Sequence, residues 1–319
     1  MPRSHLARLI QWFDAGKVNT VPESPEADNA IDLLRIIPYI FLHLACLGVF
    51  WVGCSTTAVV TALLLYALRV FAITGFYHRY FSHRTFKTSR VAQFVFAVLG
   101  ASSAERGPIW WAAHHRDHHR YSDQPEDAHS PKQHGFWWSH MLWFLSNQNV
   151  KTKFDCVPDL VKFPELMFLD RFDKLVPVAL AILLFFLGHL LAIYNPALGT
   201  NGLQMLFWGF FISTIAVMHA TFSINSLTHC FGSRRYPTKD DSRNNFWLAL
   251  LTFGEGWHNN HHHFPGSVHQ GFYWWEIDIT YYVLRLLAAL GIIWDLRKVP
   301  MEIRDLQQAS HGKSKMLLD

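Results

Sequence analysis

The sequence predicts an all-α membrane protein with four transmembrane helices in two hairpins, and three observations indicate this fold class. Only 16% of the 319 residues are charged, against roughly 25% in a soluble domain. Two long stretches, Ile36–Leu68 and Leu175–Gly232, contain no Asp, Glu, Lys or Arg. Each is too long for one span of ~20 residues, and each is interrupted by residues that favour a turn.

The turn residues divide each stretch into two spans. Gly53-Cys54-Ser55-Thr56 separates spans predicted at 36–52 and 57–76. The segment Asn195–Gly202, NPALGTNG, separates spans predicted at 175–193 and 203–224. Residues 35–306 are therefore expected to form one membrane domain. It follows an N-terminal arm, 1–34, expected as a short interfacial amphipathic helix or a disordered tail, and precedes a polar tail, 307–319.

Two shorter apolar segments are not expected to span the bilayer. Val91–Ala101 is short and predicts an interfacial or re-entrant helix. Phe272–Trp294 mixes aromatic residues with Glu276, Asp278 and Arg285, which favours a helix at the membrane interface. A fifth span is the alternative for this second segment.

The placement of basic residues predicts the orientation. Neither hairpin loop contains Lys or Arg, so the positive-inside rule places the arm, 77–174 and 225–319 in the cytoplasm. Four scattered cysteines suit a reducing compartment and exclude a Cys-X-X-Cys thiolate site. The predicted location is a multi-pass membrane protein with cytoplasmic termini.

The histidines of this sequence are its strongest candidates for metal ligands. The pattern H-x-x-H-H occurs at His115-His118-His119 and again at His258-His261-His262. Positions i, i+3 and i+4 share one helix face, so the three imidazoles of each triplet are expected to converge on one point. Three further histidines flank the predicted spans. The full candidate ligand set is His78, His83, His115, His118, His119, His229, His258, His261 and His262.

The number of imidazoles predicts two metal ions. Nine ligands exceed the four to six that one ion needs, and imidazole without thiolate suits redox iron better than a structural zinc site. His78 and His83 are five residues apart, about 140° around a regular helix. Either the helix breaks there or the two face different metals. Asn225 lies one helical turn before His229 and is a candidate for binding a water near the metal.

Carboxylates and other histidines are expected around the ligands. A ligand imidazole usually donates its other N–H to a carboxylate or carbonyl, and Asp127 and Glu255 are the first candidates, with Asp117 and Asp123 after them. His114 and His263 fall off the ligand face. Hydrogen-bonding support is expected from His129, His134 and His140, and helix packing from His43, His189 and His219.

The same residues resemble a known family. HRYFSHRTFK (78–87), HHRDHHRYSDQPEDAHSP (114–131), GFWWSH (135–140), NSLTH (225–229) and GEGWHNNHHHFP (254–265) resemble the histidine boxes of membrane acyl-CoA desaturases of the stearoyl-CoA or Δ9 type. The resemblance runs from about residue 70 to 300. It implies four helices topped by a cytosolic helical cap that holds two irons through the nine histidines above and, through a water, Asn225.

The resemblance also implies an activity. The expected reaction is O₂-dependent insertion of a double bond, Δ9, into the chain of an acyl-CoA or other acyl lipid. No haem, flavin or Fe–S motif is visible, so electrons are expected from cytochrome b5, ferredoxin or rubredoxin with its reductase. The segment Glu105–Trp111 looks closer to bacterial and plant members, which leaves carrier and bond position open and points to a bacterial inner membrane. Nucleic acid is not an expected partner.

Candidate substrate contacts follow from this reaction. Trp110 and Trp111, with Trp137 and Trp138, are expected to line an apolar tunnel. Cationic side chains are expected either at the phosphates of coenzyme A or at anionic lipid; they are Arg84, Lys87, Arg90, Arg116, Arg120, Arg234, Arg235 and Lys239.

Two alternative functions remain open at this point. One is a diiron lipid hydroxylase or oxygenase of the same superfamily. The other is a non-catalytic membrane metal-binding or transport protein, although a transporter should carry its ligands inside the spans.

Overall fold

The computed structural model describes residues 13–16, 31 and 33–305. Most of the N-terminal arm, the tail 307–319, His5 and His311 lie outside the described residues. Within them, four helices are long and apolar enough to cross a membrane: Arg35–Val52, Thr56–Ser82, Leu175–Tyr194 and Gly202–His229. The prediction of four apolar helices is confirmed, and the described chain is mostly helical with one two-stranded sheet.

Each long helix is assembled from shorter pieces. The first consists of α3 (Leu33–Ala45), η1 (Cys46–Gly48) and α4 (Val49–Val52), and the third is α10 (Leu175–Tyr194), followed by η6 (Pro196–Leu198). The second joins α5 (Thr56–Phe71) to a π-helical segment, η2 (Ala72–Ser82). The fourth joins α11 (Gly202–Gln204), a π-helical segment η7 (Met205–Ile212), α12 (Ser213–Ser226) and η8 (Leu227–His229).

The second and fourth helices run further than the sequence predicted. The predicted ends were residues 76 and 224, where polar residues begin, but the helices continue to Ser82 and His229. These extensions carry His78 and His229 directly off the ends of the apolar helices. Because no loop intervenes, these two candidate ligands are held by the same helices that pack in the bundle.

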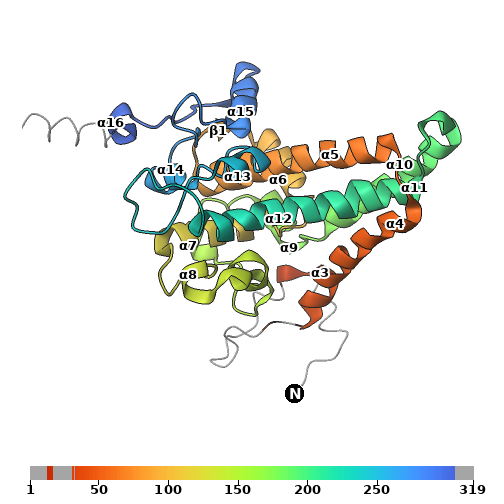
Figure 1. Cartoon of the computed structure of the whole chain (residues 1–319), viewed down its shortest axis with the longest axis horizontal. Helices are drawn as coiled ribbons and strands as arrows, with labels where there is room; N and C mark the ends of the chain where they lie inside the picture. Colours follow the sequence, from red (N-terminus) through yellow and green to blue (C-terminus); the bar gives the residue numbers. More distant parts are fainter. Residues whose placement is uncertain (1–12, 17–30, 32, 306–319) are drawn as a thin grey trace, which may run out of the picture.

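The four helices pack around apolar side chains. Helix α5 packs against η7 and α12, and α10 packs against η7 and α11 (Figure 1). The shared core contains Ala58, Leu184, Met205, Phe210 and Phe211. The outer faces carry exposed apolar side chains such as those of Phe50 and Trp51, as expected for surfaces that face lipid.

Shorter helices gather at one end of the bundle and form what we call the cap, residues 83–174 and 230–305 (Figure 1). The cap helices are α6 (Arg90–Ala101), α7 (Pro108–Tyr121), α8 (Pro131–His134), η3 (Trp138–Leu142), η4 (Trp143–Leu145), η5 (Phe154–Cys156), α9 (Pro164–Arg171), α13 (Phe246–Leu251), α14 (His258–His263), α15 (Ile279–Ala289) and α16 (Met301–Arg304).

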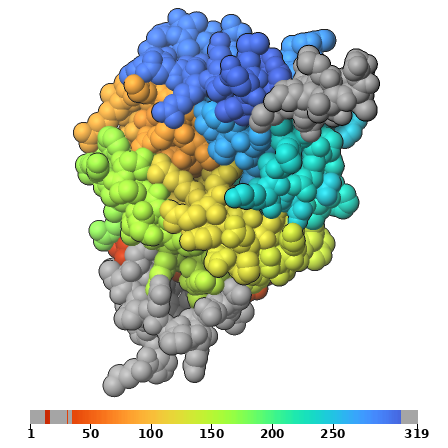
Figure 2. Space-filling model, turned by 90° about the vertical axis from the view of Figure 1, so that its left-hand side faces the viewer, coloured from red at the N-terminus to blue at the C-terminus, as the bar shows by residue number. Residues whose placement is uncertain are grey.

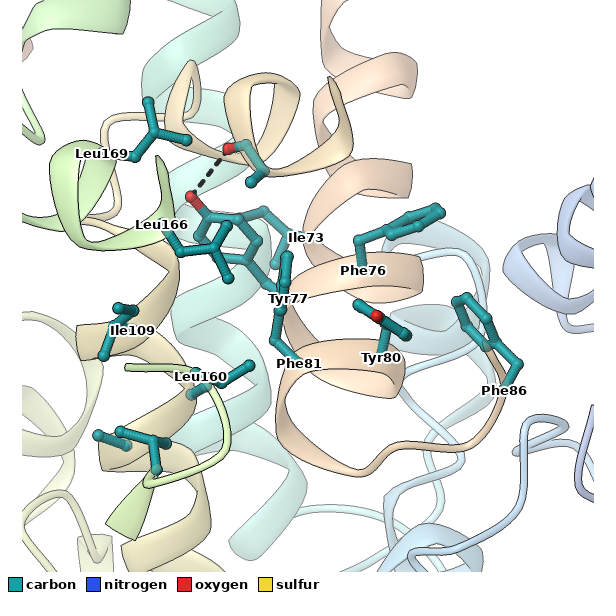
Figure 3. Packing of buried hydrophobic residues seen from close by; sticks show 14 of the residues in the cluster. Ile73, Phe76, Tyr77, Tyr80, Phe81, Phe86, Ile109, Leu160, Leu166 and Leu169 are labelled. Carbon is teal, nitrogen blue, oxygen red and sulfur yellow. Dashed lines mark hydrogen bonds between the residues drawn. The ribbon is translucent and has the colours of Figure 1, made fainter. Parts of the chain in front are cut away.

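An aromatic core joins the cap to the second long helix. Tyr77 and Phe81 of η2 lie on the side that faces Ile109 of α7 and Leu166 of α9, and Phe76 belongs to the same cluster on the other side of η2 (Figure 3). The Tyr77 hydroxyl donates to the carbonyl oxygen of Ala97 at 3.2 Å. This packing fixes the π-helical segment against α7, and these two elements carry two of the histidine boxes.

The segment 272–294 differs from its prediction. Only Ile279–Ala289 is helical, because Asp278 accepts a hydrogen bond from the backbone N–H of Tyr281 at 2.9 Å and caps the helix start. After α15 the chain forms β2 (Ile293–Trp294), which pairs antiparallel with β1 (Lys87–Thr88). Val91–Ala101 lies within helix α6, as expected for that segment.

Candidate metal centre

The structure brings the nine predicted imidazoles into two groups. One, which we call the pentad, contains His78, His83, His115, His119 and His261. The other, which we call the tetrad, contains His118, His229, His258 and His262. Within each group one ring nitrogen of every histidine lies within 4.8 Å of the others. The segments that carry the boxes meet on the face shown in Figure 2, where orange, yellow and blue chain adjoin.

Each H-x-x-H-H triplet is divided between the two groups, which corrects the expectation that its three imidazoles converge on one point. His115 and His119 of α7 join the pentad, whereas His118 between them joins the tetrad. Helix α14 does the reverse: His258 and His262 join the tetrad and His261 joins the pentad. Residues i and i+4 of a helix lie almost directly above one another. Residue i+3 lies to the other side of the line that joins them. Each of the two facing helices, α7 and α14, therefore contributes one histidine to the group in which the other helix places two.

The π-helical segment explains how His78 and His83 reach the same group. Its backbone bonds join residues five apart, as in the bond from the N–H of His83 to the carbonyl of His78 at 3.2 Å. The two ring centroids lie 4.9 Å apart. The sequence allowed a break or two different metals; a wider helical turn instead places both rings on one face.

Carboxylates hold the second nitrogen of four ligand imidazoles. Nδ1 of His118 lies 2.9 Å from Asp127, that of His229 lies 2.8 Å from Asp123, and that of His262 lies 2.8 Å from Asp240. In the pentad, Nδ1 of His78 bonds to Glu255. A carboxylate on Nδ1 fixes the tautomer that leaves Nε2 free to bind a metal.

Glu255 is itself held by a buried ion network. Arg79, fully buried next to His78, donates to Glu255 at 2.9 Å and to Asp278 at 3.0 Å. Gly254 allows this approach, because its φ is +125° and a Cβ there would lie 2.4 Å from an Asp278 oxygen. The third histidine box is thus tied to the first through a buried arginine.

Burial keeps most of the imidazoles neutral and able to bind a metal. Burial, followed by repulsion from neighbouring imidazoles, holds the pKa values of His83, His115, His119, His258 and His261 well below their ordinary value.

In the tetrad, carboxylates oppose the effect of burial on the pKa values of the imidazoles. Burial lowers the pKa of His262 to about 4 although Asp240 opposes the change. For His118, burial also favours the neutral ring, but Asp127, Asp123 and Asp240 together outweigh burial and raise the pKa.

The donor set fits metal ions. Pairs of Nε2 atoms face one another at 2.8 Å in His83–His115 and at 3.1 Å in His229–His258. Nε2 of His262 is buried and has no hydrogen-bond partner among the described residues. Clustered imidazole nitrogens that face one another are what a transition-metal site requires. Neither group, as found among the described residues, includes a cysteine, which argues against a thiolate zinc site.

The remaining histidines take supporting positions. His114 bonds to the carbonyl of Lys151 at 3.1 Å and His263 lies near the carbonyl of Ile303 at 3.2 Å. His129 packs on His118 with ring centroids 4.3 Å apart. His43, His219 and His140 form a chain of contacts at 3.0 Å that links α3, α12 and η3.

Two cavities border the two histidine groups. A small cavity of about 40 Å³ lies among His78, His115, His118, His258 and Asn225. A larger cavity of about 450 Å³ is lined by apolar residues of α3, α10, η7 and α12. The two cavities share Trp111, His115, Thr221 and Asn225 as walls. The larger cavity therefore extends from the apolar bundle to His115 of the pentad.

Of the predicted substrate contacts, Trp110 and Trp111 line the larger cavity, whereas the predicted cationic residues do not. Arg116 pairs with Asp159, Arg234 with Asp241 and Arg235 with Glu276. Arg120 lies beside Tyr121. The cations that do line the cavity are Arg35, Arg106 and Lys174, with Asp173 among them.

Sequence reasoning missed one carboxylate and ranked another too low. Asp240 follows no histidine box and reaches His262 only through the fold, so no local signal identifies it. Asp123 was placed after Asp127, because its only sequence signal is that it lies in the same acidic loop as Asp127. Asp117, also considered, pairs with Lys153 instead.

Comparison with known proteins agrees with this geometry. Residues 36–294 match the sequence model of the fatty acid desaturase family. The chain is 36% identical to an acyl-CoA 5-desaturase of Anemone leveillei over 86% of this chain and 82% of that protein. It is 36% identical to a Delta-9 acyl-lipid desaturase of Arabidopsis thaliana, covering 85% of both chains. It is 35% identical to an sn-1 stearoyl-lipid 9-desaturase of Anabaena variabilis, over 84% of this chain and 94% of that one.

The histidine boxes, the four apolar helices and these similarities lead to one conclusion: the chain belongs to the fatty acid desaturase family.

Proposed function

We propose that this protein introduces a double bond into a long-chain fatty acyl group in an O₂-dependent reaction at a centre of two irons. The pentad would hold one iron and the tetrad the other, with Asn225 near the second through a water. The observation that carries the proposal is the set of wall residues that the two cavities share, because it relates a large apolar cavity to a small one that borders both histidine groups.

The bound irons would supply the oxidising power that removes hydrogen from an unactivated methylene, which no side-chain acid or base can do. The protein's own residues position the chain. Phe210, Phe211 and Phe222 offer apolar walls, and each buried CH₂ contributes roughly 0.8 kcal/mol. Trp111 and Thr221 lie where the cavities meet and would hold two neighbouring carbons beside the ring nitrogens.

The balance of the reaction requires an outside electron source. Two hydrogens leave the acyl chain, and with two electrons and two protons they reduce O₂ to two waters. We propose a small redox protein of the cytochrome b5, ferredoxin or rubredoxin type, served by its reductase, as the donor.

Carrier and bond position are finer parts of the proposal. An acyl-CoA desaturated at Δ9 is the substrate that the boxes favour. Three cations, Arg35, Arg106 and Lys174, line the cavity with two carboxylates, Glu105 and Asp173, and this excess of positive charge suits an anionic carrier. A phospholipid offers the same charge as coenzyme A, and both classes occur among the relatives' names. Assays with acyl-CoA and with acyl phospholipid separate the two.

The membrane arrangement belongs to the same proposal. Two hairpins with the cap and both termini in the cytoplasm place the basic segments inside and the two histidine groups on one side of the membrane. A bacterial inner membrane is the proposed location.

The test is turnover by purified, iron-loaded protein with O₂, a reductant system and a saturated C16 or C18 substrate. We expect a product two mass units lighter. A product sixteen units heavier would indicate the hydroxylase instead, and bound zinc without turnover would indicate a metal-binding protein. His261→Ala, which removes one pentad nitrogen, is the matched inactive control.

A further inference from the structure

The larger cavity lies between one face of α3 and one face of α10. Its wall residues at the start of α10 and along it are Lys174, Pro177, Val178, Ala181 and Ile182. Those on α3 are Arg35, Pro38, Tyr39, Phe41 and Leu42. In both sets the residues recur at intervals of three and four, so each helix turns a single face to the cavity. Both helices pack on η7, which adds Phe210 and Phe211 to the wall.

Three apolar side chains at the edge of this cavity also belong to the outer surface of the bundle. Phe41 of α3 is 59% exposed, and Val178 and Ile182 of α10 are 46% and 51% exposed. Tyr39 and Pro177, which line the same cavity, are buried. The cavity therefore reaches the outer surface between α3 and α10. Because both helices belong to candidate membrane spans, the medium outside this opening is lipid in the proposed membrane arrangement.

Cationic side chains lie where the two helices begin. Arg35 is in the first turn of α3, and Lys174 directly precedes α10. Arg106 also lines the cavity, and Asp173 pairs both with Arg106, at 3.1 Å, and with Lys174. With Glu105 as the second carboxylate, the three cations leave the wall positively charged. Positive charge at the end of an apolar helix lies at the level of the lipid phosphates, which it attracts.

A sideways opening suits a lipid better than a water-soluble carrier. An acyl chain that leaves the bilayer for water loses roughly 0.8 kcal/mol for each CH₂, whereas sideways movement into the cavity exposes no methylene to water. From Lys174 to Ile182 the opening extends roughly 12 Å along α10, so a chain can enter along its length. An acyl-CoA that arrives through the cytoplasm needs an entrance in the cap and none between the apolar helices.

We propose that the substrate is a membrane phospholipid whose reacting acyl chain enters the larger cavity sideways between α3 and α10. Its phosphate lies at Arg35 and Lys174, and its second acyl chain stays in the bilayer against Phe41 and Ile182. This inference rests on the proposed function and assigns the carrier, on grounds that the histidine boxes do not supply. The product returns to the bilayer through the same opening.

Delivery of one acyl chain on two carriers tests the substrate class. Iron-loaded protein in vesicles receives ¹³C-labelled stearoyl chains either in phosphatidylglycerol of the bilayer or as stearoyl-CoA in the water, with O₂ and a reductant system. We expect desaturation of the phospholipid to be roughly tenfold faster or more. Faster desaturation of acyl-CoA overturns this inference and leaves the proposed function standing. No product from either carrier would defeat the proposed function, and this inference with it.

A narrower opening tests the route. Ile182→Trp places a larger side chain at the edge of the opening. Leu183→Trp is the matched control, because Leu183 is the next residue of α10, is exposed and is not among the described residues that line the cavity. We expect Ile182→Trp to raise the KM for phosphatidylglycerol roughly tenfold and Leu183→Trp to leave it unchanged. Equal KM values in the two variants would contradict entry at this opening.

Electron paramagnetic resonance reports on the same route without turnover. Phosphatidylglycerol with a nitroxide on one acyl chain should show an immobilised component with the wild type, from the chain held in the cavity. Ile182→Trp should lose most of this component, and Leu183→Trp should keep it. The same spectrum from both variants would count against the inference.

Removal of one cation tests the position of the phosphate. Arg35→Gln should raise the KM for phosphatidylglycerol roughly tenfold, the effect of one lost hydrogen bond to a charged group. The KM for a diacylglycerol with the same chains, which lacks the phosphate, should not change. Arg171→Gln is the control, since Arg171 pairs with Asp14 on α9 and is not among the described residues of this cavity wall. An equal rise for both lipids would show that Arg35 does not bind the phosphate.

Discussion

The pentad and the tetrad are both clusters of histidine nitrogens, but they differ in the number of imidazoles and in the number of carboxylates that support them. The pentad has five imidazoles and one carboxylate, Glu255, behind them. The tetrad has four imidazoles, and the Nδ1 atoms of three of them contact Asp127, Asp123 and Asp240. The tetrad, which has one imidazole fewer than the pentad, therefore has three carboxylates behind its rings instead of one.

The two proposed metal positions should therefore not be interchangeable. Carboxylates behind imidazoles orient the rings and make them better donors, so the tetrad should stabilise a higher metal charge than the pentad. The pentad instead relies on rigid packing and on the buried Arg79 network. Substitutions made in one group at a time should separate the two positions.

Loss of a ligand should be the most severe change. His261→Ala removes a pentad nitrogen and His262→Ala a tetrad nitrogen from the same helix. We expect each to abolish turnover and to lower the iron content by about one ion per chain, while the protein stays in the membrane. Elemental analysis with activity assays checks this. Retained activity in either variant would remove that histidine from the ligand set.

Removal of the pentad carboxylate should affect folding as well as metal binding. Glu255→Gln takes one of two carboxylates from the fully buried Arg79. Breaking a buried ion pair costs about 3–5 kcal/mol, and because Asp278 remains we expect the lower end of that range. Thermal unfolding of the metal-free variant measures it. Unchanged stability would show that Arg79 needs only Asp278.

Removal of a tetrad carboxylate should act on the metal more than on the fold. Asp240→Asn weakens the hold on His262, and the loss of such a contact typically costs roughly 10–100-fold in metal affinity. Asp241→Asn is the matched control, since Asp241 pairs with Lys132 at the surface. Competition with a chelator compares the two. Equal affinities in both variants would deny Asp240 its role.

Acid should reveal the opposite protonation preferences of neighbouring histidines. The pKa of His119 is lowered by burial, so the unfolded chain takes up a proton first and stability falls as pH drops below about 6.5. The pKa of His118 is raised by Asp127 despite burial, so its contribution is present at low pH and lost as pH rises.

Two variants of α7 separate these effects. Between pH 7 and pH 5, metal-free His119→Gln should lose less melting temperature than the wild type, and His118→Gln should lose more, each by roughly a few degrees. Differential scanning fluorimetry across that range checks the sign. Identical slopes in both variants would contradict the assigned protonation states.

Local sequence patterns were enough to predict the four apolar helices and the nine clustered imidazoles. The length of an apolar stretch and the spacing of histidines both depend only on residues that are close together in the sequence. The division of each triplet was not predictable in this way. His118 and His261 exchange groups only because α7 and α14 face each other, which is a property of the fold. The π-helical turn at His83 likewise depends on packing against α7, as Figure 3 shows for its neighbours Tyr77 and Phe81.

The supporting residues were the least predictable part. Asp240 meets His262 across a separation of 22 residues, and no periodicity connects them. The cationic residues expected at the substrate are mostly engaged with carboxylates, as with Arg84 and Asp159, because ion pairing depends on the distant partner. Residues that follow a local repeat were found, and residues chosen by tertiary contact were not.

Iron content and the Mössbauer spectrum of the purified protein examine the two-iron centre itself. We predict two irons per chain with nitrogen and oxygen ligands only, giving two quadrupole doublets of equal area and different splitting, one for each group. One iron per chain, or zinc in its place, would contradict the claim that the pentad and the tetrad each hold an iron.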